Sequence, residues 1–334
     1  MTTIAIAGAT GAVGEALIEI LESRQFPVSE LYLLASERSA GKRLQFHGKS
    51  IMVQDIAEFD FSQAQIGLFS AGSAVSEVYA PKAAEAGCVV VDNTSFFRYE
   101  PDIPLIVPEV NGHRLEDYRN RNIIANPNCS TIQMLVALKP IHDEARITRI
   151  NVATYQAVSG AGAGGIKELA GQTANLLNAK PIEPDVMPVQ IAFNAIPQID
   201  SFQDNGYTKE EMKMVWETQK IFEDDLIQVN PTCVRIPVFY GHSEAVHIET
   251  EHPISAQAAM DLLAQAPGVE LLEGTAYPTA VEHAAGTDPV FVGRVREDIS
   301  HPSGLNLWVV SDNVRKGAAL NSVQIAEMLV QHWS

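Results

Sequence analysis

The stretch TIAIAGATGAVG, residues 3–14, decides the fold of the first part of the chain. Residues 4–7 form a short apolar run typical of a buried strand, and Val13, Leu17 and Ile20 then recur at helical spacing. Three glycines stand between strand and helix, where they allow a tight turn and let a pyrophosphate approach the helix N-terminus. Their spacing differs from the usual Gly-x-Gly-x-x-Gly, but the context favours a dinucleotide-binding loop over a turn that serves packing alone.

Short apolar runs continue outward from this stretch, at residues 31–35, 66–69, 88–91 and 122–125. Several are continuous rather than alternating, as in strands of a parallel sheet that is covered on both faces. The rhythm of strand and helix predicts an α/β fold, with a doubly wound, Rossmann-like domain over residues 1–128.

The pattern changes after about residue 146. A long run rich in β-branched residues covers 147–158, helical patterns follow near 165–179 and 208–223, and further strands are expected at 232–238, 244–250, 290–296 and 305–311. We therefore expect a second, α+β domain over residues 129–313, with a mixed or antiparallel sheet. A helical pattern over 314–334 is expected to return to the first domain.

The composition narrows the class of protein. The chain has 334 residues, 46% hydrophobic, and a net charge of 23 − 41 = −18. So acidic a chain repels nucleic acid and anionic membranes, and no apolar stretch approaches the roughly 18 residues of a membrane span. With an apolar run at residue 4 there is no room for a signal peptide, and three cysteines make no disulfide framework. We expect a cytoplasmic protein with reduced thiols, without a metal site.

The end of the second expected strand bears on cofactor choice. Ser36, Arg38 and Ser39 offer hydrogen-bond donors and a positive charge, which suit the 2′-phosphate of NADP. Glu37 stands among them and could instead bind the ribose hydroxyls of NAD. The stretch favours NADP, and the NAD alternative remains open.

Cys129 is the candidate nucleophile. It lies in NPNCST, residues 126–131, after an expected strand and at the start of a helical pattern, where the helix dipole favours a thiolate. Cys88 and Cys233 lie within apolar strand patterns and are expected to be structural. A thiolate beside a nicotinamide cofactor suggests covalent catalysis on an acyl group. His242, expected in a loop between two strands, is a candidate proton shuttle, although most loop histidines are merely solvated.

Charged residues in apolar surroundings suggest the substrate's charge. Arg98 follows Phe96 and Phe97, and Arg235 lies between Val234 and Ile236. A buried guanidinium needs an anion, which can be a ligand or one of the chain's own carboxylates. Glu210 and Lys213 lie three residues apart on an expected helix, which is also the spacing of an ordinary surface pair.

Taken together, these segments resemble the bacterial type of the aspartate-semialdehyde dehydrogenase family. The resemblance rests on motifs in family order along essentially the whole chain: GATGAVG (8–14), ASERSAGK (35–42), DNTSFFR (92–98), VPEVN (107–111), NPNCST (126–131), YQAVSGAG (155–162), EEMKM (210–214), RIPV (235–238), GHSEAV (241–246) and SDNVRKGAALNS (311–322). The pair NPNCST and HSEAV is specific, whereas the glycine loop is shared with many other families.

The resemblance implies a role for each matched residue. Cys129 resembles the acyl-accepting nucleophile, His242 its acid/base partner and Gln156 the residue that orients the substrate. Arg235 resembles the partner of the substrate α-carboxylate and Glu210 that of its α-amino group. Arg98, Asn128 and Lys213 resemble the phosphate-binding set. The implied cofactor contacts are Gly8, Thr10, Gly11, Ala12, Val13, Ser36, Arg38, Ser39, Ser159, Gly160, Gly162 and Asn313.

The same resemblance implies an activity and an assembly. The expected reaction is the NADPH-dependent reduction of L-aspartyl-4-phosphate to L-aspartate 4-semialdehyde through a cysteine thioester, which supplies lysine, methionine and threonine synthesis. A homodimer through the second domain's sheet is implied as well. One alternative is a related reductase of N-acetylglutamyl phosphate, whose acetylated amine would leave Glu210 without a charge to pair. Another is a catalytically silent paralogue, which should have lost the thiol or the histidine.

Overall fold

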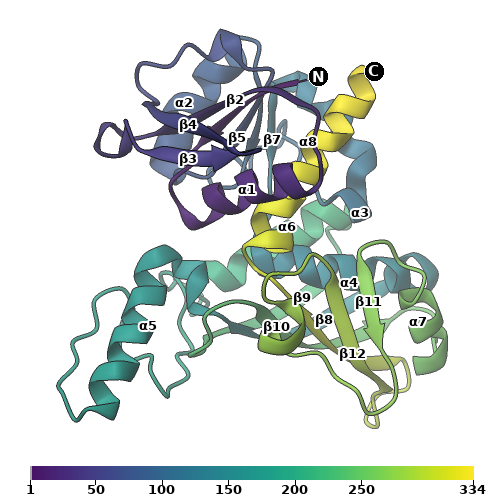
Figure 1. Ribbon diagram of the computed structural model, residues 1–334. Helices are drawn as coiled ribbons and strands as arrows, with labels where there is room; N and C mark the ends of the chain where they lie inside the picture. The colour runs from purple at the N-terminus through teal and green to yellow at the C-terminus, as the bar shows by residue number, and fades with distance from the viewer. Residues whose placement is uncertain (1) are drawn as a thin grey trace. The chain divides into compact units, whose positions relative to one another are not determined.

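The computed structural model describes residues 2–334, and the chain divides into two compact units. The first contains the chain up to Pro127 together with Ala318–Ser334, and the second is Asn128–Gly317. Figure 1 shows their elements along the chain. In the part of the chain described, no helix combines the length and the apolar composition needed to cross a membrane.

The first unit is built on a seven-stranded sheet in the order β3-β4-β2-β1-β5-β6-β7. All neighbouring strands are parallel except the β3–β4 pair, so the expected doubly wound α/β fold is confirmed. Its elements are β1 (Thr2–Ala7), α1 (Ala12–Ser23), β2 (Val28–Ala35), β3 (Arg43–Phe46), β4 (Lys49–Asp55), β5 (Ile66–Phe69), α2 (Ser73–Glu85), β6 (Val89–Asp92), α3 (Pro108–Asn111), β7 (Ile123–Ala125) and α8 (Leu320–Trp333).

The antiparallel β3–β4 pair was not predicted from the sequence. Its strands carry charged and polar residues, among them the exposed Arg43 and Lys49, and the apolar run of β4 covers only residues 51–53. A π-helical segment, Arg315–Ala319, leads directly into α8, so the C-terminal segment is helical from Arg315, one residue after the expected start. Val323, Ile325 and Leu329 of α8 are fully buried in the same core as the strands of this unit.

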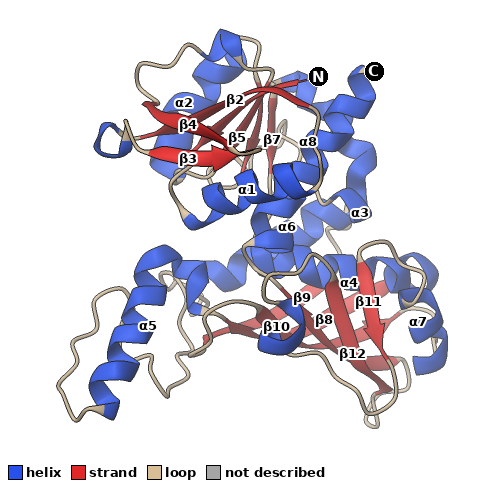
Figure 2. Ribbon diagram, in the orientation of Figure 1, coloured by secondary structure: helices blue, strands red, loops and turns tan. Residues whose placement is uncertain are grey.

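The second unit contains a six-stranded sheet in the order β11-β12-β13-β10-β8-β9. The β8–β9 and β11–β12 pairs are parallel and the others antiparallel, which confirms a mixed sheet (Figure 2). Its elements are α4 (Cys129–Ala145), β8 (Ile147–Gln156), α5 (Gly162–Leu177), α6 (Lys209–Phe222), β9 (Gln228–Arg235), β10 (His242–Thr250), α7 (Ala256–Leu263), β11 (Val269–Leu272), β12 (Val290–Glu297) and β13 (Gly304–Ser311).

Helices α4, α6 and α7 pack against this sheet and against one another on one face. Because side chains alternate along a strand, every second residue of the central strands β8 and β10 faces these helices. On β8 these buried residues include Thr154 and Gln156, and on β10 they include His242 and Glu244. The mixed sheet therefore carries a row of polar side chains beneath its helices, at the N-terminal end of α4.

Candidate active site

The glycine loop lies at the end of β1 and borders a cavity of about 310 Å³ within the first unit. Gly8 has φ of +88°, and a Cβ there would stand 2.9 Å from the backbone of Ser70 and Ala71. Only glycine therefore fits this turn without displacing backbone. Gly11 precedes α1, and Ala12 and Val13 form its first residues, so backbone N–H groups at the positive end of the helix dipole lie beside the loop.

The far wall of this cavity comes from the turn after β2. Gly8, Thr10 and Gly11 line it from the glycine loop, and Ser36, Arg38 and Ser39 line it from the turn after β2. Arg38 is exposed, and Glu37 is not among the residues that line the cavity. The groups present fit a dinucleotide, since they combine helix-end amides for a pyrophosphate with a guanidinium and hydroxyls for a further phosphate.

Cys129 is the first residue of α4 in the second unit, and it is half-buried. Asn128 caps the helix: its Oδ1 accepts the N–H groups of Ser130 and Thr131 at 3.0 and 3.2 Å. Its backbone N–H donates to Glu217 Oε2 at 2.6 Å. These bonds fix the turn that presents the thiol, at a helix end whose dipole favours a thiolate.

The two other cysteines behave differently. Cys88 and Cys233 are buried, and burial raises the pKa of the Cys88 thiol to about 12 and also raises the pKa of the Cys233 thiol. A thiol with so high a pKa is protonated near neutral pH and is a poor nucleophile. Among the three, only Cys129 combines partial exposure with a helix N-terminus.

Gln156, Glu210 and Asn128 form a hydrogen-bonded cluster next to this helix end. Glu210 Oε1 accepts from Asn128 Nδ2 at 2.9 Å and from Gln156 Nε2 at 3.1 Å, while Oε2 pairs with Lys213 Nζ at 2.8 Å. Burial raises the pKa of Glu210, but the Lys213 charge and these hydrogen-bond donors lower it further, to about 2. Glu210 is therefore a carboxylate at neutral pH. The Glu210–Lys213 pair has only 8% and 12% of its side-chain surface exposed, so it is not an ordinary surface pair.

Arg235 ends β9 and is 6% exposed. Its Nη1 donates to the carbonyl oxygen of Ala157 at 2.7 Å. Within residues 2–334 no carboxylate forms an ion pair with it, so the internal salt bridge that the sequence left open is absent there. Burial lowers the pKa of Arg235, and the nearby Glu210 and Cys129 oppose that shift. A buried guanidinium in this state is suited to an anionic ligand.

His242 begins β10 and is fully buried, which corrects the prediction of a loop residue. The backbone N–H of Ala157 donates to its Nδ1 at 3.0 Å, so the neutral ring carries its proton on Nε2. Burial and the Arg235 charge lower the pKa of His242 to about 3. Its Nε2 lies 3.5 Å from Gln156 Nε2. Two N–H donors at this separation can converge on one oxygen atom.

Other predicted residues lie around this cluster or away from it. A Cβ on Gly160 would stand 2.7 Å from Arg235 Nη1 and 3.5 Å from His242 Nε2. Asn313 Oδ1 accepts from Ser159 Oγ at 3.1 Å and from Gly241 N at 2.9 Å, which ties the loop before His242 in place. Gly162 starts α5. Arg98 belongs to the first unit, where its Nη2 donates to the carbonyl oxygen of Asn93.

Two residues of the cluster were missed by the sequence reasoning. Glu217, which holds the Asn128 N–H, lies seven residues after Glu210 on α6, so the two share a helix face. Thr154, whose hydroxyl donates to Gln156 Oε1 at 2.9 Å, lies two residues before Gln156 on β8. The periods of the helix and of the strand were signals that could have found both.

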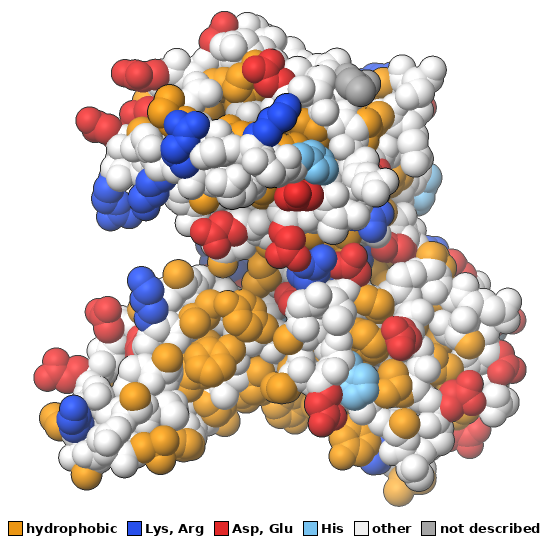
Figure 3. All heavy atoms as spheres, viewed as in Figure 1, with side chains coloured by type: hydrophobic (Ala, Val, Ile, Leu, Met, Phe, Trp, Pro, Cys, Tyr) orange, Lys and Arg blue, Asp and Glu red, His pale blue; other side chains and the backbone are white. Residues whose placement is uncertain are grey.

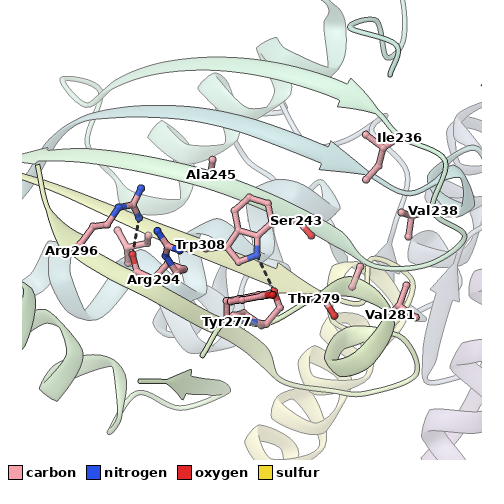
Figure 4. A pocket seen from close by; sticks show the side chains of 13 residues that line it. Ile236, Val238, Ser243, Ala245, Tyr277, Thr279, Val281, Arg294, Arg296 and Trp308 are labelled. Atoms are coloured by element: carbon pink, nitrogen blue, oxygen red, sulfur yellow. Dashed lines mark hydrogen bonds between the residues drawn. The ribbon is translucent and has the colours of Figure 1, made fainter. Parts of the chain in front are cut away.

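A larger cavity of about 520 Å³ lies on the opposite face of the same sheet (Figure 4). On β10, Ser243 and Ala245 line it, whereas His242 and Glu244 face the helices. Trp308 Nε1 donates to the carbonyl oxygen of Pro278 in its wall. Among the described residues, its lining is largely apolar and contains no cysteine, histidine or carboxylate. The larger cavity is therefore not the candidate active site.

Comparisons with known proteins agree with the geometry. Residues 3–118 match the family model described as semialdehyde dehydrogenase, NAD binding domain, and residues 138–316 match semialdehyde dehydrogenase, dimerisation domain. The chain is 67% identical over 330 residues to aspartate-semialdehyde dehydrogenase 2 of Vibrio cholerae, covering 99% of this chain and 98% of that protein.

Solved structures of aspartate semialdehyde dehydrogenases also match the fold of this chain. One is aspartate semialdehyde dehydrogenase II complexed with ASA from Vibrio cholerae, at a TM-score of 0.99 and 66% identity, covering 100% of this chain and 99% of the other. Another is aspartate semialdehyde dehydrogenase with NADP from Candida albicans, at a TM-score of 0.78 and 25% identity, covering 98% of each chain. The resemblance drawn from the motifs is confirmed, and the chain belongs to the aspartate-semialdehyde dehydrogenase family.

Proposed function

We propose that the protein reduces L-aspartyl-4-phosphate to L-aspartate 4-semialdehyde with NADPH, and runs the reverse phosphorylating oxidation of the aldehyde. The observation that carries the proposal is the placement of Arg235, buried and without a carboxylate partner in residues 2–334, in the field of the Glu210 carboxylate and of Cys129. An amino-acid head group presents one carboxylate and one ammonium, which match Arg235 and Glu210 in charge. Family membership supports this choice of substrate.

Cys129 is the proposed nucleophile. Its thiolate attacks the carbonyl carbon of the acyl phosphate, so that a carbon–sulfur bond forms, the carbon–oxygen bond to phosphate breaks, and phosphate leaves with the electron pair. The nicotinamide cofactor, when bound, supplies the hydride that reduces the thioester. The carbon–sulfur bond then breaks as the aldehyde carbonyl forms, which regenerates the thiolate. Arg98, Asn128 and Lys213 stay predictions as ligands of the phosphate group.

His242 and Gln156 are proposed to act on the carbonyl oxygen. Neutral His242 carries its proton on Nε2, and Gln156 Nε2 lies 3.5 Å away. The two N–H groups can donate together to the oxygen on which negative charge develops, in a site from which water is largely excluded. In the direction of aldehyde oxidation the same two N–H groups stabilise the oxyanion that forms when the Cys129 thiolate adds to the aldehyde, before hydride passes to the cofactor. The acid/base role of His242 stays a prediction.

The preference for NADP is also a proposal. The family model identifies an NAD-binding domain, and the relative from Candida albicans was solved with NADP. Support in this chain comes from the cavity beside the glycine loop, which Ser36, Arg38 and Ser39 line and Glu37 does not. Ser159, Gly160, Gly162 and Asn313 stay predictions as cofactor contacts.

The alternatives are not favoured. A reductase of N-acetylglutamyl phosphate would meet an uncharged acetylated amine with the ionised Glu210. A silent paralogue would not be expected to retain both the thiol at a capped helix end and the oriented histidine. The relatives that match over nearly the whole chain at high identity bear the name aspartate-semialdehyde dehydrogenase.

We further propose that the protein is a homodimer in the cytoplasm and that the sheet face opposite the helices forms the interface. The matching family model is a dimerisation domain. Figure 3 shows hydrophobic side chains gathered on the second unit between α5 and the sheet. The exposed large hydrophobic residues of this unit include Leu177, Phe193 and Phe202. The cavity at Trp308 adds an apolar surface on the sheet face. A cytoplasmic location fits a catalytic thiol that must stay reduced.

The test of the activity is NADP reduction with aspartate semialdehyde and inorganic phosphate. Reduction should depend on all three components and should not occur in a buffer that lacks both phosphate and arsenate. An N-acetylated semialdehyde serves as the comparison substrate. If it is used as efficiently as the free amine, Glu210 does not read the ammonium group and the proposed substrate is wrong.

A further inference from the structure

The side-chain amide of Gln156 must point in one direction for the proposed chemistry. The two ends of an amide group are nearly equal in shape, so its hydrogen-bond partners decide which end faces where. Glu210 is ionised and only accepts hydrogen bonds, and it faces Nε2 at 3.1 Å. In the other orientation, Gln156 Oε1 would face the Glu210 carboxylate, and two acceptors would repel each other. The flip would also take the Gln156 N–H donor away from its position beside His242.

Glu210 alone holds the Gln156 amide in that orientation only weakly, because the carboxylate is shared among several donors. Its Oε1 already accepts from Asn128 as well as from Gln156, and its Oε2 pairs with Lys213. In the proposed function the substrate ammonium also binds this carboxylate, so its hold on Gln156 is shared during the reaction. A second partner that stays in place throughout would keep the amide oriented.

Thr154 supplies such a partner at the other end of the amide. Its hydroxyl donates to Gln156 Oε1 at 2.9 Å, and the residue is fully buried. Both residues lie on β8, two positions apart, so the regular strand fixes their separation. An oxygen atom at that end accepts the hydroxyl proton, whereas the NH₂ group of a flipped amide could only donate to the hydroxyl oxygen and would leave the buried proton to find another acceptor.

Two neighbours of Thr154 could compete with Gln156 for its proton. The strand register places Glu244 of β10 on one side and Cys233 of β9 on the other. Burial raises the pKa of Glu244 and that of Cys233, which favours the protonated form of each, while a hydrogen bond between Thr154 and Cys233 opposes the shift of the thiol. Burial at these two register positions therefore disfavours an anion that would compete for the hydroxyl.

We propose that Thr154 is a positioning residue for the reaction: it locks the Gln156 amide with Nε2 toward Glu210 and His242. The proposal rests on the proposed function of Gln156, and Thr154 itself touches neither substrate nor cofactor. Its contribution should appear in the chemical step more than in cofactor binding, because only the donor beside His242 depends on it.

The experiment compares Thr154→Val with Thr154→Ser in the full-length protein. Valine keeps the shape and removes the hydroxyl, while serine keeps the hydroxyl. We expect Thr154→Val to lower kcat about tenfold, the usual effect of losing one such hydrogen bond, and Thr154→Ser to stay within about twofold of the parent. The KM for the semialdehyde should change less than kcat, and NADP affinity should be unchanged for Thr154→Val. Its unfolding midpoint should fall only slightly, because one buried hydrogen bond is lost, and the assays are run well below that midpoint. Equal kcat values for the valine variant and the parent would overturn the proposal.

A double-mutant cycle with Gln156→Ala separates positioning from packing. If Thr154 acts through Gln156, the variant with both changes should be no slower than Gln156→Ala alone. Losses that multiply would show that Thr154 acts by another route and would overturn the proposal, as would an equal defect in the serine variant. If Gln156→Ala is itself fully active, the proposed function of Gln156 fails and this inference fails with it; in the other cases the proposed function stands.

Discussion

Replacing Arg235 by lysine tests the identity of the substrate rather than thiol chemistry in general. Arg235 Nη1 already donates to the Ala157 carbonyl oxygen at 2.7 Å, which leaves the rest of the guanidinium for a ligand. The ammonium of a lysine at this position can reach the carbonyl or a substrate carboxylate, but it cannot reproduce the fork that serves both. With only 6% of the residue exposed, water does not replace the lost bond.

The expected magnitude follows from that geometry. A hydrogen bond to a charged group contributes about 1.5–3 kcal/mol, and each 1.36 kcal/mol is about a factor of ten in rate. Loss of one such bond, together with a misplaced carbonyl carbon at Cys129, should lower kcat/KM for the semialdehyde by about a hundredfold. The assay is phosphate-dependent NADP reduction, with NADP affinity measured separately and expected to be unchanged.

A matched control is Arg114→Lys, an exposed arginine that pairs with Asp117 on the surface of the first unit and should leave kcat/KM unaltered. Two results would refute the reasoning. One is an Arg235→Lys enzyme that keeps more than about half of the parent kcat/KM. A two-point bond between Arg235 and the substrate carboxylate would then contribute little to binding of the transition state. The other is a joint loss of thermal stability and of NADP affinity, which would make Arg235 a structural residue.

Three further changes test other parts of the site. Cys129→Ser should abolish turnover and keep NADP binding, because a hydroxyl is a far weaker nucleophile than a thiolate. Iodoacetamide should label Cys129 first in the parent enzyme. Earlier labelling of another cysteine, with activity retained, would contradict the role of Cys129. Arg38→Ala should raise the KM for NADPH and barely change the KM for NADH. If the parent enzyme is equally efficient with both cofactors, Glu37 rather than Arg38 determines cofactor choice in the turn after β2. His242 has a pKa of about 3 when folded against 6.5 for an ordinary histidine. The unfolded chain therefore takes up more protons between these values, and stability falls as pH drops below 6.5. His242→Gln should remove that component, so its unfolding midpoint should decline less steeply than the parent's between pH 6.5 and about 5; parallel declines would show that the ring is not buried in its neutral form.

The sequence by itself determined the parts of this protein whose signals are local. The glycine loop between a strand and a helix predicted the α/β domain, and the apolar helical pattern that follows NPNCST predicted a cysteine at a helix start, as α4 confirms. Both signals arise within about one turn of helix or strand, where residue type and backbone conformation are directly linked. Cys88 and Cys233 were assigned to the interior for the same reason, and both are buried.

Only the tertiary structure decided how residues distant in the sequence act on one another. His242 was a candidate proton shuttle expected in a loop, because a single histidine carries no signal of its burial, yet as the first residue of β10 it is enclosed and its pKa is lowered. Glu210 and Lys213 had the spacing of a surface pair, but packing of α6 on the sheet buried them beside Asn128 and Gln156. A pKa, an amide orientation or an unpaired guanidinium depends on which dipoles and charges surround a group in space, and the pairing of β8, β9 and β10 beneath α4 and α6 sets those surroundings.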